Sequence, residues 1–287
     1  MKKSMLYLNT SVIFLGTLFS SCSKTDEIDQ FSEDPSAKDL SVETLNLKYS
    51  GKNDEKLRVF KGPQVQLGEG KIRSWISLDS EDFPVEIGLV MTSEVFNNLE
   101  ILPESHTPVV LPLHHKAKEL TPFEHVGVNW QSAGHLPVFL VKHFDIHFYM
   151  ITNEERLAIP EYSASTDAAF NLFPPEGYMP GDYGAPPGED AVYPQMGKHW
   201  LPLDLPSYLP FTEIMVLGTY NGEFIFIEPM ITLEVLQSNP DFSGAYSQPM
   251  YFQETSNYPT TYNIYEDADT GDVYVSLSEF VARQAGE

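Results

Sequence analysis

The sequence predicts a mostly β protein, a barrel or sandwich with a few short helices and one long loop rich in proline, glycine and tyrosine. Three observations support this fold class. Short runs rich in β-branched and aromatic residues alternate with turn residues. Helical signals are few and short. Hydrophobic residues make up 42% of the chain and aromatic residues 13%, which is enough for a substantial core.

The N-terminus has the architecture of an export signal. Lys2 and Lys3 precede an apolar stretch from Met5 to Phe19, and Ser20-Ser21-Cys22 follows. A membrane-spanning helix needs about 20 apolar residues, more than this stretch provides. We therefore expect residues 1–21 to be removed as a signal peptide.

Cys22 is the expected site of lipidation. The segment Leu18–Cys22 resembles a lipobox, and Cys22 is the only cysteine, so a disulfide within the chain is excluded. A diacylated cysteine carries two acyl chains, which stable anchoring requires. The following residues, Ser23–Asp29, resemble the export tag of surface lipoproteins. These features predict a lipid-anchored protein of the outer membrane at the cell surface; the alternative for Cys22 is a free or disulfide-bonded thiol.

Composition divides the rest of the chain into two parts. Residues 22–44 are polar and acidic, with Pro35 and little to bury, and predict a flexible tether. Residues 45–287 predict a single β-rich domain. Its expected strands are Leu57–Phe60, Gln64–Leu67, Ile72–Leu78, Val85–Met91, Val109–Leu113, Val138–Ile151, Ile214–Thr219, Glu223–Ile227 and Val273–Leu277.

Turn and cap signals complete this outline. Asn221-Gly222 predicts a tight hairpin, because both residues accept positive φ. Between Phe173 and Tyr193, prolines, glycines and tyrosines predict a long loop, either a wall or lid over a site or a mobile surface loop. Short helical turns are expected at Thr92–Val95, Asn153–Arg156, Thr232–Gln237 and Ser278–Arg283.

Charge excludes one class of partner. The chain carries 41 acids and 17 bases, a net charge of −24, and the bases are scattered. Nucleic-acid binding needs clustered lysine and arginine, so no nucleic-acid partner is expected. The expected partners are the membrane, through the lipid anchor, and a small molecule or protein that the sequence does not identify.

The segment from His143 to Met150 is the richest in potential ligands. On a strand, His143, Asp145, His147 and Tyr149 share one face. Imidazole and carboxylate together suit a divalent ion such as zinc, iron or manganese. A regular strand holds the two histidines about 13 Å apart, so neighbours two residues apart are easier partners.

Later segments supply further candidates for the same site. His199 lies in Met-Gly-Lys-His-Trp, and Glu228 ends a very apolar strand, where an unpaired carboxylate is costly. His135 is a further candidate. We predict one divalent-metal site drawn from His143, Asp145, His147, His199 and Glu228. The remaining histidines, His106, His114, His115 and His125, are expected at the surface or at the edge of the core.

An alternative without metal explains the same residues. His143, Asp145 and His147 can form a buried hydrogen-bond network, with Glu228 paired to Lys198 or Arg156. The protein would then be a binding or scaffolding module with an aromatic contact loop that includes Tyr178, Tyr183 and Tyr193. With metal, it would bind a small ligand or carry out metal-assisted chemistry, and the sequence names no reaction.

Three motifs in order resemble an uncharacterised family of exported bacterial proteins. They are His-Phe-Asp-Ile-His-Phe-Tyr from His143, Met-Gly-Lys-His-Trp from Met196 and Glu-Pro-Met-Ile-Thr from Glu228. The resemblance spans about Val65 to Arg283, and Trp130-Gln131-Ser132 departs from the family's Trp-Asn-Pro. It implies kinship and no particular activity.

Overall fold

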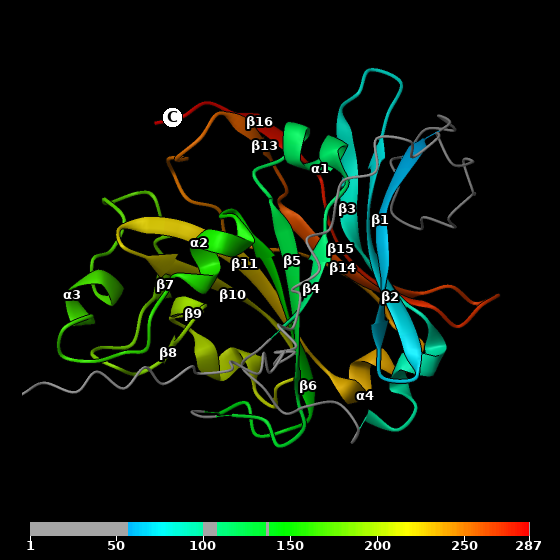
Figure 1. Cartoon of the computed structure of the whole chain (residues 1–287), viewed down its shortest axis with the longest axis horizontal. Coiled ribbons are helices and arrows are strands. Elements are labelled where there is room, and N and C mark those ends of the chain that lie inside the picture. Colours follow the sequence, from blue (N-terminus) through cyan, green and yellow to red (C-terminus); the bar gives the residue numbers. More distant parts are fainter. Residues whose placement is uncertain (1–56, 100–107, 136–137, 287) are drawn as a thin grey trace, which may run out of the picture. The chain divides into compact units, whose positions relative to one another are not determined.

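The computed structural model describes residues 57–99, 108–135 and 138–286, and in this part of the chain the protein is a β sandwich (Figure 1). The described residues form a six-stranded sheet, an eight-stranded sheet and a small two-stranded sheet, built from antiparallel pairs. The mostly β prediction is confirmed. Of its two architectures, the sandwich is correct, because the strand order in neither large sheet closes into a barrel. The expected signal peptide, Cys22 and the acidic tether lie outside the described residues.

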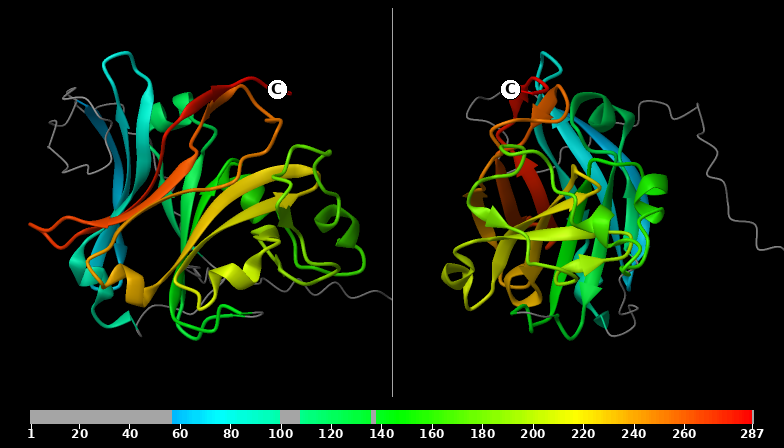
Figure 2. Two further views of the ribbon diagram at one scale, coloured as in Figure 1. Left: turned by 180° about the vertical axis from the view of Figure 1, so that it is seen from behind. Right: turned by 90° about the vertical axis from the view of Figure 1, so that its left-hand side faces the viewer.

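The six-stranded sheet joins segments from both ends of the described chain. Its order is β1-β2-β3-β15-β14-β12. Strand β3 pairs with β15, and Figure 2 shows the blue and cyan strands beside the orange and red ones. The strands are β1 (Arg58–Leu67), β2 (Gly70–Leu78), β3 (Pro84–Met91), β12 (Asp241–Ala245), β14 (Thr261–Glu266) and β15 (Val273–Ser278).

The eight-stranded sheet carries the candidate ligands. Its order is β4-β5-β6-β11-β10-β9-β7, with β8 also paired to β9. The hairpin between β10 and β11 is confirmed, with φ of 51° at Asn221 and 85° at Gly222. The strands are β4 (Val109–Pro112), β5 (His125–Gln131), β6 (His143–Tyr149), β7 (Tyr183–Gly184), β8 (Val192–Tyr193), β9 (Gly197–Pro202), β10 (Glu213–Tyr220) and β11 (Glu223–Thr232).

The helices are short, as expected. Thr152 and Thr232 accept hydrogen bonds from the first turns of α2 and α4, which confirms two of the expected helical turns. The helix expected at Ser278–Arg283 is wrong: Val281–Arg283 is strand β16, paired with β13 (Ser256–Tyr258). The helices are α1 (His115–Leu120), α2 (Asn153–Leu157), α3 (Asp167–Phe170) and α4 (Leu233–Leu236), with 3₁₀ helices at Ser93–Phe96 and Leu205–Tyr208.

Several strand boundaries differ from prediction. Strand β6 is shorter than the predicted run from Val138, because Phe139 bridges back to His135 in a separate bend. Strand β11 continues beyond its predicted end at Ile227 and includes Pro229, although proline cannot donate to a ladder. Strands β5, β9, β12 and β14 lie outside the predicted runs, because glycine, proline and polar residues interrupt their apolar patterns.

The two large sheets enclose the main hydrophobic core. From β6, the alternate residues Phe144, Ile146 and Phe148 belong to this core, together with residues of β2, β3, β14 and β15 from the other sheet. The intervening residues of β6 point to the opposite, outer face of the eight-stranded sheet, as strand alternation requires.

The chain after β6 covers this outer face. Ile159 and Phe170 pack there against Tyr149 and Phe226. The polar face of β6 is therefore buried as deeply as the apolar one. The alternating pattern of β6 would place His143, Asp145 and His147 in solvent, but the covering segment buries them.

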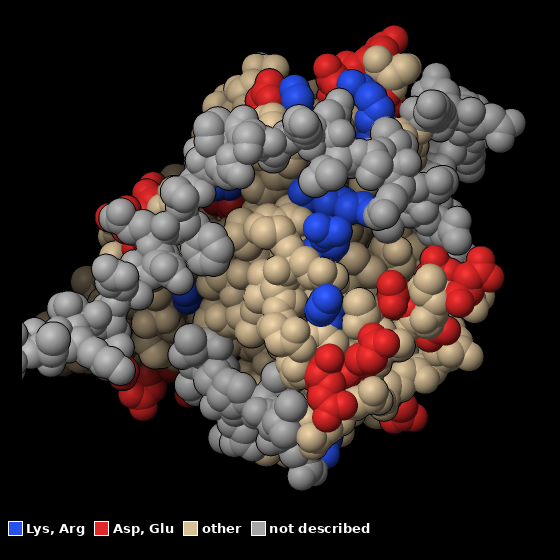
Figure 3. Space-filling model, turned by 45° about the vertical axis from the view of Figure 1, so that its right-hand side comes forward, with Lys and Arg blue, Asp and Glu red and all other residues tan. Residues whose placement is uncertain are grey.

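Helix length and surface charge can be read from the described residues. Among the described residues, no helix has the length and apolar character needed to cross a membrane. On the face shown in Figure 3, lysine and arginine side chains form small groups, and the largest group of aspartate and glutamate side chains lies along the lower right edge.

Gly218 provides a test of how tightly the outer face is packed. A methyl group at this position would overlap the Phe226 ring, which itself contacts the rings of His147 and His199 at 4.8 and 5.0 Å between centroids. We expect Gly218→Ala to lower the free energy of unfolding by about 1–3 kcal/mol, the usual cost of overpacking. Urea unfolding measures this. Gly181→Ala, where a methyl group meets nothing within 4 Å, is the control, and an equal effect of both substitutions would contradict the packing described.

Candidate metal centre

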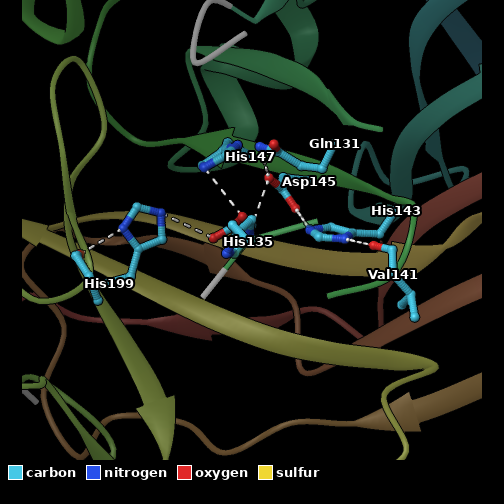
Figure 4. Close-up of polar contacts among 9 residues, drawn as sticks. Gln131, His135, Val141, His143, Asp145, His147 and His199 are labelled. Carbon is cyan, nitrogen blue, oxygen red and sulfur yellow. Dashed lines mark hydrogen bonds and ion pairs between the residues drawn. The ribbon is translucent and has the colours of Figure 1, made fainter. Parts of the chain in front are cut away.

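Strand pairing brings three candidate ligands together from β6, β11 and β9. The register between β6 and β11 pairs Ile227 with Phe148 and Met230 with Asp145, which places Glu228 opposite His147. On the other side of β11, Glu228 pairs with a residue of β10, and the next strand, β9, carries His199. All three side chains lie on the outer face, and both imidazoles, labelled in Figure 4, contact the Glu228 carboxylate.

The distances in this group match those of coordinating atoms. The Nε2 atom of His147 lies 3.4 Å from Oε1 of Glu228, and Nε2 of His199 lies 3.5 Å from Oε2. Both contacts are long for an N–H···O hydrogen bond, which is typically about 2.7–3.2 Å. Two ligand atoms about 2.1 Å from a tetrahedral ion lie about 3.4 Å apart. The three side chains are almost completely buried, with 9% exposure at most.

A backbone contact orients the His199 ring. Its Nδ1 atom lies 3.2 Å from the carbonyl oxygen of Ala191. Because a carbonyl oxygen only accepts hydrogen bonds, Nδ1 is the protonated nitrogen, and in the neutral ring the lone pair is on Nε2. That lone pair faces Glu228. Metal-binding histidines are commonly held in this way, with the second ring nitrogen donating to a carbonyl or carboxylate.

Two buried cations considered as partners of Glu228 do not neutralise it. Lys198 donates from Nζ to the carbonyl oxygen of Gly188 at 2.6 Å. Arg156 donates to the Asn153 side chain at 2.9 Å and lies over the Tyr149 ring. The metal-free alternative paired Glu228 with one of these cations, and the structure gives both of them other partners.

Several polar atoms of the group are buried without a hydrogen bond. Oε2 of Glu228 and both ring nitrogens of His147 lack a hydrogen-bond partner among the described residues. A buried polar atom that makes no hydrogen bond typically costs about 1–3 kcal/mol. Of these atoms, Nε2 of His147 faces the Glu228 carboxylate, so the two facing groups leave each other's hydrogen-bonding capacity unused.

Burial determines the protonation of this group in the metal-free protein. It raises the pKa of Glu228 well above its ordinary value, and the nearby Asp145 carboxylate adds to the increase. Burial lowers the pKa of His147 to about 3 and that of His199 to about 4. The two imidazoles are therefore neutral near pH 7.

A second group of potential ligands lies beside the first. Oδ1 of Asp145 is 3.1 Å from Nε2 of His143, and Oδ2 is 3.8 Å from Nε2 of His135. Gln131 donates from Nε2 to Oδ2 of Asp145 at 2.8 Å. Burial alone raises the pKa of Asp145, but contact with His143, with smaller contributions from His135 and His147, lowers it overall.

A small cavity separates the two groups. It has a volume of about 20 Å³, and its lining includes His199 and Glu228 from the first group and His135 and Asp145 from the second. Tyr193, from the long loop, forms another part of the wall. A volume of this size holds one water molecule. The loop therefore contributes a wall to the site.

The five predicted ligands are thus divided between two groups. His147, His199 and Glu228 form the first, whereas His143 and Asp145 belong to the second. Each group could hold a metal ion, because one donor atom from each member lies within 4.8 Å of the others. Strand extension explains the division, since it keeps His143 and His147 apart on the same face.

The other histidines differ in their positions. His135, which the sequence offered only as a further candidate, is the third member of the second group. His125 was expected at the surface or at the edge of the core. It is buried and stacks on Tyr149 with 4.7 Å between ring centroids, because β5 continues the covered face. His114 accepts a hydrogen bond at the start of α1, and His115 is exposed. His106 lies outside the described residues.

Gln131 is a site residue that the sequence pattern did not single out. It lies at the end of β5, where the register pairs it with His143 of β6. Its contact with Asp145 follows from that pairing, which no local signal in the sequence specifies.

The chain matches no family model, no curated protein and no solved structure. The kinship suggested by its three motifs therefore stays a prediction.

The metal-free protein should keep His147 and His199 neutral far below the usual range of histidine. We expect long-range ¹H–¹⁵N NMR spectra to show His199 with the proton on Nδ1, and neither ring titrating between about pH 7 and pH 5. Both pKa values are below the ordinary 6.5, so the unfolded chain binds more protons. The contribution of these histidines to stability should consequently fall as the pH drops below about 6.5. A titration of either ring near the ordinary pKa would show that the burial described is wrong.

Proposed function

We propose that this protein is a membrane-anchored lipoprotein that holds one divalent metal ion between His147, His199 and Glu228. One observation carries the proposal: two neutral, buried imidazoles face a buried carboxylate that has no lysine or arginine beside it among the described residues. Leaving such groups without partners is costly. A bound divalent ion would accept the lone pairs of these groups and supply the positive charge that the ionised carboxylate requires.

The donor set favours a borderline ion. Two histidines and one glutamate are the protein ligands of several catalytic zinc sites, in which a water molecule takes the fourth position. The same set of two imidazoles and one carboxylate also binds iron(II) in a facial arrangement. Zinc is the first choice, with iron and manganese as the other ions that these donors suit.

Two of the proposed ligands, His199 and Glu228, also line the small cavity. Because the cavity holds about one water molecule, the ion would bind water or a molecule of comparable size there. An ion in this position can polarise its ligand or lower the pKa of bound water. The function supported best is therefore binding or activation of a small ligand at a buried divalent ion.

The alternative module depends on the aromatic loop. Tyr183 is buried and donates to the carbonyl oxygen of Met215 at 3.0 Å, and Tyr193 faces the candidate metal centre. Tyr178 lines a separate groove of about 460 Å³, where it packs against Tyr251. A protein or small-molecule ligand could bind there, and the loop as a whole serves the inner site more than an outer surface.

Metal content tests the proposed centre. We expect the full-length chain, solubilised in detergent, to contain close to one tightly bound divalent ion per molecule in this group. His147→Ala or Glu228→Gln should weaken binding by about 100-fold or more, because each removes a direct ligand. Elemental analysis and competition with a chelator measure the two quantities.

Matched controls separate the loss of a ligand from general effects. His115→Ala and Glu223→Gln change exposed residues of the same types, the second on the same strand as Glu228, and should leave metal binding unchanged. Circular dichroism checks that every variant folds. A wild-type protein without metal, or folded variants that keep it at wild-type affinity, would refute the proposal.

Proton release provides an independent test. Metal binding requires the ionised form of Glu228, whose pKa burial raises well above its ordinary value. Below that raised pKa, affinity should increase about tenfold per pH unit as one proton is displaced. The two histidines are already neutral in this range. Calorimetry in buffers of different ionisation enthalpy counts the protons, and pH-independent affinity would argue against Glu228 as a ligand.

The membrane anchor is a separate part of the proposal. It is supported by the signal-like N-terminus and the single Cys22. We expect the wild-type chain to fractionate with the outer membrane and incorporate labelled palmitate, and Cys22→Ser to lose both properties. If unlabelled Cys22→Ser still fractionates with the membrane, anchoring does not depend on this residue.

A further inference from the structure

We infer that His135, His143 and Asp145 form a second divalent-metal site, so that the buried centre holds two ions beside one cavity. The inference extends the proposed function, which requires only the ion between His147, His199 and Glu228. It rests on the donor atoms of the second group, on the way neighbouring residues orient them, and on the cavity that both groups share.

The second group has the donors and the spacing that a divalent ion requires. Two imidazole nitrogens approach opposite oxygens of one carboxylate, at 3.1 Å from His143 and 3.8 Å from His135. The donor atoms all lie within 4.8 Å of one another. His143 and Asp145 are at most 5% exposed, whereas the His135 side chain is 23% exposed. His135 is therefore the member of the group most accessible to solvent.

Neighbouring groups orient these donors toward one point. Nδ1 of His143 lies 2.6 Å from the carbonyl oxygen of Val141, so this nitrogen donates and, in the neutral ring, Nε2 carries the lone pair. Gln131 donates to Oδ2 of Asp145 at 2.8 Å and fixes the carboxylate. Both contacts are of the supporting kind that surrounds metal ligands. Figure 4 shows these contacts beside the first group.

The principal metal-free explanation is an ion pair between protonated His143 and Asp145. Their 3.1 Å contact falls in the distance range of a hydrogen bond, yet Nε2 of His143 and Oδ1 of Asp145 lack a partner with hydrogen-bond angles among the described residues. Both atoms are buried, and they lie 3.1 Å apart. An ion between them satisfies both without requiring a linear N–H···O arrangement.

The shared cavity connects the two sites. Its lining takes His135 and Asp145 from one group and His199 and Glu228 from the other, and its volume of about 20 Å³ has room for one water molecule. A water molecule there would lie beside residues of both groups. Paired ions that share a ligand of this kind are a recurring arrangement in enzymes that activate water or bind phosphoryl oxygens. The site is thus suited to a ligand that bridges two ions through oxygen.

Zinc and manganese titrations of the metal-free full-length chain in detergent test the inference. We expect the wild type to bind two zinc ions per chain, and His135→Ala to bind one with the affinity of the remaining site unchanged. His135 is the ligand of choice for substitution, because it is partly exposed and lies outside the named strands. With manganese, the wild type should give an electron paramagnetic resonance spectrum of coupled ions, and His135→Ala the spectrum of an isolated ion.

Two further variants give the measurement a reference. His143→Gln should also reduce the stoichiometry from two to one, and His115→Ala, an exposed histidine, should leave it at two. If the wild type binds one zinc ion and His135→Ala leaves that binding intact, the second site is refuted while the first stands. If the wild type binds none, both proposals fail. Two ions retained in folded His135→Ala and His143→Gln would place the second ion elsewhere and overturn the assignment.

Discussion

A carboxylate in the middle of a buried sheet is the constraint on which the rest of this structure depends. Glu228 lies on β11, a central strand of the eight-stranded sheet, and is 1% exposed. Transfer of an ionised carboxylate into such a place costs several kcal/mol unless other groups compensate. Neighbouring strands place His147 and His199 next to it, and Lys198 and Arg156 are occupied elsewhere. The fold thus gathers the donor atoms of two imidazoles and one carboxyl group at a place that neither Lys198 nor Arg156 neutralises.

The two faces of the eight-stranded sheet have different roles. The inner face packs Phe144, Ile146 and Phe148 into the main core, which fixes the positions of the strands. The outer face then presents the polar residues of the same strand at defined spacing. Two smaller apolar clusters, one around Met230 and one around Tyr149, lie outside the main core. Rigid placement in an environment of low polarity strengthens electrostatic interactions in the site.

The long covering segment takes part in the site directly. Tyr193 forms part of the cavity wall, its ring 5.1 Å from that of His199. Ala191, two residues earlier, supplies the carbonyl oxygen that orients the same histidine. One stretch of the loop therefore both shapes the cavity and fixes a ligand. A loop with these contacts is part of the site and not only a connection between strands.

The sequence alone determined the features that depend on residues close together in the chain. The tertiary structure decided which of the predicted ligands come together. The β class, the Asn221-Gly222 hairpin and the shared face of His143, Asp145 and His147 follow from short-range geometry, since strand alternation and turn φ angles need no distant contact. Strands without an apolar pattern, β5 and β9 among them, escaped prediction, because pairing with better strands holds them in the sheet. Strand pairing also divided the five predicted ligands into two groups and added His135 to the second. The physical reason is that side chains on one extended strand cannot converge on a point, so the centre is assembled from several strands whose order and register no local pattern specifies.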